Sequence, residues 1–101
     1  MIVNIHMWYE RNKCSVVELP DRIGENIEYY LDQFYQYAVS GQICEEFYTY
    51  AIDYVDDRMS DSEKISGFLY YLYLYHFKKG ENYTVIAENA PLDPQYKSVK
   101  L

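Results

Sequence analysis

The sequence is short of the residues that build phosphate-binding loops and metal centres. Its four glycines are isolated from one another, so no glycine-rich phosphate loop is present. None of its serines lies in a nucleophile-elbow context. The histidines His6 and His76 are far apart and have no zinc spacing with the two cysteines. We therefore expect structural roles for both histidines, with no catalytic residue, metal or cofactor.

Cysteines and long hydrophobic runs are also scarce. Cys14 and Cys44 are too few for the disulfide framework of a small secreted domain, so we expect two free, mostly buried thiols. The N-terminus lacks the charged and apolar regions of a signal peptide. The longest apolar run, over residues 67–77, is too short to cross a bilayer. These features predict a cytoplasmic protein with no membrane partner.

Positive charge is scarce and unevenly placed. Nine lysines and arginines stand against sixteen aspartates and glutamates, which gives a net charge of −7. Twelve of these carboxylates fall within residues 18–63, where only Arg22 and Arg58 oppose them, so this acidic segment carries −10. The chain has no basic stripe for nucleic acid. A field of this sign attracts basic proteins and repels nucleic acid and anionic membranes.

Apolar residues, and tyrosine above all, are plentiful. Hydrophobic residues make up 50% of the chain, which is enough for a core and argues against disorder. The fourteen tyrosines offer large apolar rings with a polar tip, which suit cores and binding surfaces alike. The length predicts a single domain over residues 1–89. Residues 90–101 contain Pro91 and Pro94 and are predicted to form an extended tail.

Alternating residues near the N-terminus predict a β-hairpin made of residues 2–9 and 14–19. Its inward positions are Val3, Ile5, Met7 and Tyr9, and its outward positions are Asn4, His6 and Trp8. Residues 83–88 form a predicted last strand that pairs with this hairpin. We expect an α+β fold in which a small antiparallel sheet, the N-terminal hairpin plus the C-terminal strand, is packed with three helices.

Hydrophobic spacing predicts those three helices. The first covers about residues 21–39 and the second about residues 43–58, each with one apolar face. The third begins at Ser60-Asp-Ser-Glu63, the pattern of a capping box, and ends near Gly80. Residues 67–77 also suit a β-strand, but the signals at both ends favour a helix that is buried nearly all round.

Acidic and aromatic residues share the outward faces of the first two predicted helices. Like charges at this spacing weaken a helix by roughly 0.2–0.5 kcal/mol per pair, so an unpaired stripe is a candidate functional surface. The alternative is a plain solubilising surface. We favour docking on a basic cleft of another protein, with Tyr29 and Tyr48 as aromatic anchors. The candidate partner-binding residues are Glu25, Glu28, Tyr29, Asp32, Glu45, Glu46, Tyr48, Asp53, Asp56 and Asp57.

A basic cleft is most often a nucleic-acid site, where carboxylates spaced along helices stand in for phosphates. In its small size, its acidity and its lack of a catalytic signature, the chain is similar to immunity proteins of nuclease toxins. It is similar in the same respects to phage anti-CRISPR and anti-restriction proteins. That similarity implies an inhibitor and nucleic-acid mimic, which binds a nuclease or nucleoprotein complex and makes no direct contact with nucleic acid.

Two other functions remain open. The pairs Glu25-Asn-Ile-Glu28 and Asp53-Tyr-Val-Asp56 resemble the ExxE and ExxD pairs of the all-α nucleotide pyrophosphohydrolases, except that Asp53 stands where that pattern has glutamate. This resemblance implies four carboxylates that hold Mg²⁺ for phosphate chemistry. The second possibility is a structural subunit of a larger assembly. A homodimer is also open, because the weakly positive tail suits the acidic helices of a second copy.

Overall fold

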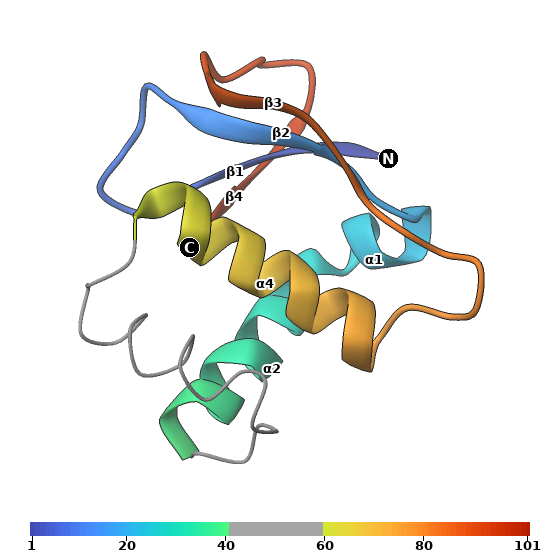
Figure 1. Ribbon diagram of the computed structural model, residues 1–101. Coiled ribbons are helices and arrows are strands. Elements are labelled where there is room, and N and C mark those ends of the chain that lie inside the picture. The colour runs from blue at the N-terminus through green and yellow to red at the C-terminus, as the bar shows by residue number, and fades with distance from the viewer. Residues whose placement is uncertain (41–59) are drawn as a thin grey trace.

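The computed structural model describes residues 1–40 and 60–101, which form a mixed sheet with helices on one side of it (Figure 1). The predicted α+β fold is confirmed, whereas the predicted helix over residues 43–58 lies outside the described residues. In chain order the elements are β1 (Ile2–His6), β2 (Cys14–Glu18), α1 (Asp21–Glu25), α2 (Ile27–Ser40), α4 (Asp61–Tyr75), β3 (Thr84–Ala90) and β4 (Lys97–Lys100).

The four strands follow the order β3-β2-β1-β4. β1 and β2 form the predicted antiparallel hairpin, and β3 pairs antiparallel with β2 as expected for the last strand. β4 instead pairs parallel with β1, so the prediction of a purely antiparallel sheet is wrong at one pair. A parallel pair needs a long connection between its strands, and here nearly the whole chain separates β1 from β4.

The predicted tail over residues 90–101 is also wrong, because its last residues belong to the sheet and the core. Val99 is only 2% exposed and Leu101 is buried beside it. The Leu101 N–H donates to the His6 carbonyl at 2.8 Å, and the Trp8 N–H donates to the Leu101 carbonyl at 2.7 Å. The strand was missed because its sequence, Lys-Ser-Val-Lys, holds one apolar residue and so carries no alternation signal.

Both faces of β1 are buried, which corrects the predicted inside and outside of the hairpin. Val3, Ile5 and Met7 face the core as predicted. Asn4 and His6 were predicted to face outward and are buried instead, because the connection between β3 and β4 crosses that face of the sheet. The Asn4 side-chain amide donates to the Asp93 carbonyl at 2.8 Å.

The predicted alternation fails beyond His6, where β1 ends. Trp8 is exposed as predicted, but Tyr9, which was predicted to face the core, is also exposed. Its hydroxyl donates to Asp61 at the start of α4. The His6 Nδ1 lies 2.9 Å from the Met7 carbonyl and 2.8 Å from the Glu10 carbonyl. Because both partners are acceptors, His6 carries its proton on Nδ1 and holds this turn together, which is a structural role.

The single helix predicted over residues 21–39 is two helices, α1 and α2, which meet at Asn26. The Asn26 side chain donates to the Arg22 carbonyl at 2.9 Å, and the Asn26 carbonyl accepts from the Tyr29 N–H at 3.0 Å. Asparagine favours such local bonds over a helix interior, which explains the break. The predicted apolar face survives it: Ile23, Ile27, Leu31 and Phe34 are all buried.

Helix α4 is a helix rather than a strand, and its capping box is present. The Ser60 hydroxyl accepts from the Glu63 N–H at 3.2 Å, and the Glu63 carboxylate accepts from the Ser60 N–H at 3.4 Å. Phe68 and Leu72 are fully buried against the sheet and α2. The prediction of burial nearly all round is wrong, because the C-terminal half of α4 exposes Tyr70, Tyr73, Leu74 and Tyr75.

Replacing Ser60 by alanine is expected to lower the free energy of unfolding by about 1 kcal/mol, because the first turn of α4 then loses its side-chain acceptor. Urea unfolding followed by circular dichroism measures the difference. Ser66→Ala, at an exposed position in the middle of the same helix, is the control and should be neutral or slightly stabilising. Equal losses in the two variants would contradict the capping role.

Candidate functional site

Four of the predicted partner-binding residues lie together where α1 meets α2. Glu25 is the last residue of α1, and Glu28, Tyr29 and Asp32 follow on the first turns of α2. All four are exposed, and Tyr29 has 59% of its surface free. We call these four residues the α2 acidic face. The other six candidates, Glu45, Glu46, Tyr48, Asp53, Asp56 and Asp57, lie outside the described residues, as does Cys44.

One carboxylate of the α2 acidic face is paired within the chain. The Lys97 ammonium on β4 lies 2.9 Å from the Glu28 carboxylate and 3.5 Å from the Glu25 carbonyl. The hydrogen bond from Lys97 lowers the pKa of Glu28 below its ordinary value. The sequence suggested that the basic tail suits the acidic helices of a second copy, but Lys97 contacts the acidic helix of its own chain. The negative charge of this face therefore rests mainly on Glu25 and Asp32.

Tyr29 offers an aromatic surface beside these carboxylates. Its ring meets the ring of Tyr30 edge to face, with centroids 5.3 Å apart and planes at 74°. Tyr30 is half-buried against the core, so it supports Tyr29 from below. An exposed tyrosine on a rigid helix loses little conformational freedom on binding, which is a property of interface anchors.

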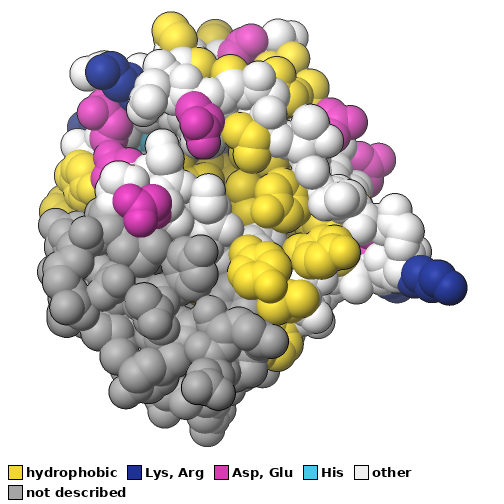
Figure 2. All heavy atoms as spheres, in the orientation of Figure 1, with side chains coloured by type: hydrophobic (Ala, Val, Ile, Leu, Met, Phe, Trp, Pro, Cys, Tyr) yellow, Lys and Arg dark blue, Asp and Glu magenta, His cyan; other side chains and the backbone are white. Residues whose placement is uncertain are grey.

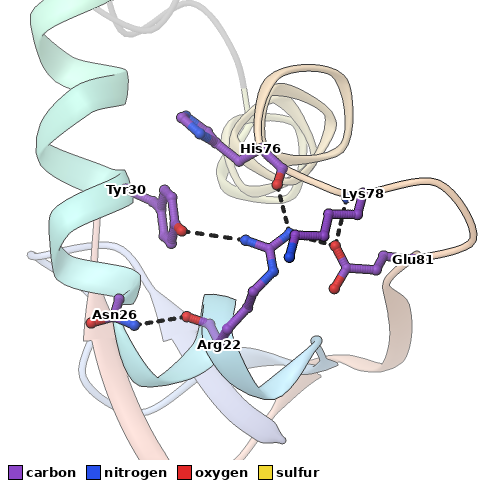
Figure 3. Close-up of polar contacts among 6 residues, drawn as sticks. All are labelled: Arg22, Asn26, Tyr30, His76, Lys78 and Glu81. Atoms are coloured by element: carbon purple, nitrogen blue, oxygen red, sulfur yellow. Dashed lines mark hydrogen bonds and ion pairs between the residues drawn. The ribbon is translucent and has the colours of Figure 1, made fainter.

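Arg22, the one described cation of the acidic segment, does not neutralise this face. Figure 3 shows its guanidinium directed toward the end of α4 and the segment that follows, where it pairs with Glu81. It also donates to the His76 carbonyl at 2.8 Å and to the Tyr30 hydroxyl at 3.5 Å. Arg22 therefore connects α1, α2 and the chain after α4. No local pattern in the sequence indicates this cluster, because Arg22 is 54 residues from His76 and 59 residues from Glu81.

Glu81 and His76 complete the cluster around Arg22. Glu81 accepts the Lys78 N–H as well as the guanidinium, and these bonds lower the pKa of its carboxyl group. Burial, with a smaller contribution from Arg22, lowers the pKa of His76. The His76 Nε2 lies 2.9 Å from the Tyr71 hydroxyl. His76 is thus neutral and hydrogen-bonded, as a structural histidine is.

Replacing Glu81 by glutamine is expected to lower the melting temperature at pH 7 and to have a smaller effect near pH 3. The pKa of Glu81 is lower in the folded state than in the unfolded state. Its contribution to the free energy of unfolding is therefore complete above the unfolded pKa and is lost as the pH falls through the folded pKa. Thermal unfolding at both pH values measures this, and Glu18→Gln at the exposed end of β2 is the control. An equal loss at both pH values would show that the lost contribution is not ionic.

A cavity of about 40 Å³ lies between the β1–β2 hairpin and the start of α4. It is lined by His6, Cys14, Ser15 and Asp61, among other residues. These side chains resemble the parts of a nucleophilic site, but the volume holds little more than one water molecule. Burial raises the pKa of the Cys14 thiol, which disfavours the reactive thiolate. Cys14 is free, as predicted, and its sulfur lies 3.7 Å from the Asn4 side-chain oxygen.

The carboxylate pairs predicted to hold Mg²⁺ are only partly described. Glu25 and Glu28 lie on different helices, on either side of the Asn26 break, and Lys97 contacts the second of them. Asp53 and Asp56 lie outside the described residues. Within residues 1–40 and 60–101, no three histidine, cysteine or acidic side chains gather into a metal-binding group.

Comparison of the chain with protein-family models, with curated proteins and with solved structures found no match in any of the three. In the described part of the chain, no helix combines the length and the apolar character needed to span a membrane. Function must therefore be argued from the surface itself.

Proposed function

We propose that this protein is an inhibitor that binds a basic, nucleic-acid-acting protein and blocks its active or nucleic-acid-binding site. An immunity protein for a nuclease toxin and a phage anti-CRISPR or anti-restriction protein both act in this way. The observation that carries the proposal is Tyr29, 59% exposed on α2 beside Glu25 and Asp32, within a segment of charge −10. The α2 acidic face thus combines an aromatic anchor with a negative rim.

Two further features support an acidic docking surface. Arg22 is held by Glu81 and the His76 carbonyl, so its charge is directed away from the carboxylates of α2. Lys97 ties Glu28 to β4, which fixes the start of α2 against the sheet. A rigid surface that is mainly negative speeds encounter with a basic cleft and fixes the register of docking. Each lysine or arginine that it covers is one that no longer contacts phosphate.

Affinity capture tests the proposal. The immobilised protein is exposed to source-cell lysate and eluted in salt steps beside a matched column that carries Glu25→Lys with Asp32→Lys. We expect a basic nuclease or nucleoprotein that leaves the first column at moderate salt and is absent from the second, because screening weakens interactions between opposite surface charges. The captured protein should then lose its nucleic-acid binding or cleavage as the free inhibitor is added.

Three results would overturn the proposal. The first is an empty eluate from the unmodified column. The second is the same set of proteins from both columns, which would mean that the α2 acidic face is not the binding surface. The third is a captured protein whose action on nucleic acid is unchanged by excess inhibitor. The proposal requires that the inhibitor cover the active or nucleic-acid-binding site of its partner.

A further inference from the structure

The two edges of the sheet differ in length and charge. β4, at one edge, has four residues and a lysine at each end. Short length and edge lysines are the usual protection of a strand against pairing with another chain. β3, at the other edge, has seven residues and is the longest of the four described strands. Its first four residues, Thr84-Val85-Ile86-Ala87, carry no charge. Among the described residues, one edge of the sheet is therefore protected and the other is open.

β3 also exposes apolar side chains. Five of its seven residues are exposed, and among them Ile86 has 53% of its surface free and Val85 has 38%. β-Branched residues at these positions suit pairing with another strand and gain nothing from contact with water. An edge strand also presents unpaired N–H and carbonyl groups, which a further strand would satisfy.

The apolar surface of β3 continues onto α4. The Tyr83 ring before β3 contacts the Phe77 ring, with centroids 6.3 Å apart, and Phe77 contacts Tyr73 at 6.1 Å. Tyr73 and Leu74 are exposed, and with Phe77 they form the apolar part of a groove of about 280 Å³ at the end of α4, whose other side is lined by Lys78, Lys79 and Glu81. Figure 2 shows hydrophobic side chains in a band over α4 and toward the sheet on this face. The rings of Tyr83, Phe77 and Tyr73 thus connect the exposed apolar residues of β3 with those of α4.

We propose that β3 is a homodimer interface, at which it pairs antiparallel with β3 of a second copy about a two-fold axis through Ile86. The two sheets then become one continuous sheet of eight strands. We assign a second copy of this chain as the occupant because β3 is complementary to itself in this register. Ile86 then faces Ile86 of the second copy, and each Glu88 faces the partner's Thr84. Assembly stops at two copies because the remaining edge of each sheet is β4, with its lysines.

Charge favours this register. Glu88 is the one charged residue of β3, and pairing centred on Ile86 places the two Glu88 positions four residues apart along the strand direction. At about 3.4 Å per residue this separation is about 14 Å, which exceeds the Debye length of about 8 Å at physiological salt. The two carboxylates therefore repel each other little.

The area that a stable dimer needs comes from the helices. An antiparallel strand pair is related by an axis perpendicular to the sheet, so both copies of α4 lie on the same side of the joined sheet. The exposed Tyr73 and Leu74 of α4 then add apolar contacts to the strand pairing. Stable interfaces bury roughly 1,200–2,000 Å², which a single strand pair does not reach without such additions.

The oligomeric state of the purified full chain, measured by light scattering from micromolar to millimolar concentration, tests the proposal. We expect a reversible dimer, and Ile86→Lys should weaken it at least tenfold with an unchanged circular dichroism spectrum. Trp8→Lys is the matched control, because it removes an exposed hydrophobic residue (69% exposed) and adds the same charge away from β3. A monomer at every concentration, an assembly larger than two, or a dimer equally weakened by both variants would each overturn the proposal.

Register and salt give two further readouts. Ile86→Cys should oxidise to a disulfide-linked dimer, whereas Glu88→Cys should not, because the two Glu88 positions lie far apart in this register. A cross-link at Glu88 in place of Ile86 would refute the axis. Added salt should strengthen the dimer, since it screens repulsion between two chains of charge −7. Salt should weaken docking of the α2 acidic face on a basic partner, so the two proposals fail independently.

Discussion

Val99→Asp is expected to destabilise the protein severely. Val99 is 2% exposed and belongs to the hydrophobic core beside Ile5 of β1, although it lies in a segment that was predicted to be a tail. A carboxylate at this position loses its water and gains no partner, which costs about 4 kcal/mol or more. Domains of this size have only about 5–15 kcal/mol of stability in total. Urea unfolding monitored by tryptophan fluorescence and circular dichroism measures the loss.

Ser98→Asp provides the control for this substitution. Ser98 precedes Val99 on the same strand and is exposed, so the added carboxylate remains in water and should change stability by less than about 0.5 kcal/mol. If Val99→Asp were as mild as Ser98→Asp, residues 97–101 would not be part of the folded core, and the pairing of β4 with β1 would be wrong.

Reversing two charges of the α2 acidic face is expected to abolish partner binding while the fold is kept. Glu25→Lys combined with Asp32→Lys places two cations against a basic cleft, and such like-charge contacts cost several kcal/mol. We expect the dissociation constant of the captured partner to rise at least about 100-fold, which corresponds to about 2.7 kcal/mol. Titration calorimetry at constant salt gives this value, and an unchanged thermal unfolding curve shows that the fold is intact.

A second double reversal separates the surface from the net charge. Glu10→Lys with Glu18→Lys changes the total charge by the same amount, but on the hairpin rather than on α2. Binding should weaken far less in this variant, and mainly through the association rate. Tyr29→Ala tests the anchor with no change of charge and should weaken binding at least about 10-fold, or about 1.4 kcal/mol. Equal effects of the two double reversals would show that only overall charge matters.

Local signals in the sequence predicted much of the fold. Ser60 and Glu63 fix the start of α4 through bonds over three residues, so the pattern alone was sufficient. The apolar faces of β1 and α2 follow from periodicity in the same way. The break at Asn26 also had a local cause, the preference of asparagine for capping bonds, which the spacing of apolar residues concealed.

The rest depended on contacts between distant parts of the chain. Asn4 and His6 alternate as outward residues should, and they are buried only because residues 91–96 cross that face of the sheet. In the candidate site, the exposure of Tyr29 followed from helical spacing. The pairing of Glu28 with Lys97 joins residues 69 positions apart, and only the position of β4 brings them together.

The parallel pairing of β1 with β4 has a consequence for how the chain folds. Val3 pairs with Lys97, so this contact closes a loop that contains almost every other residue. Contacts at such sequence separation form slowly, because chain entropy must be lost before they contribute. During synthesis, β1 has one unpaired edge until residues 97–100 leave the ribosome, which is a period of exposure to aggregation. The acidic segment emerges before β4, and its charge of −10 keeps incomplete chains apart through that period.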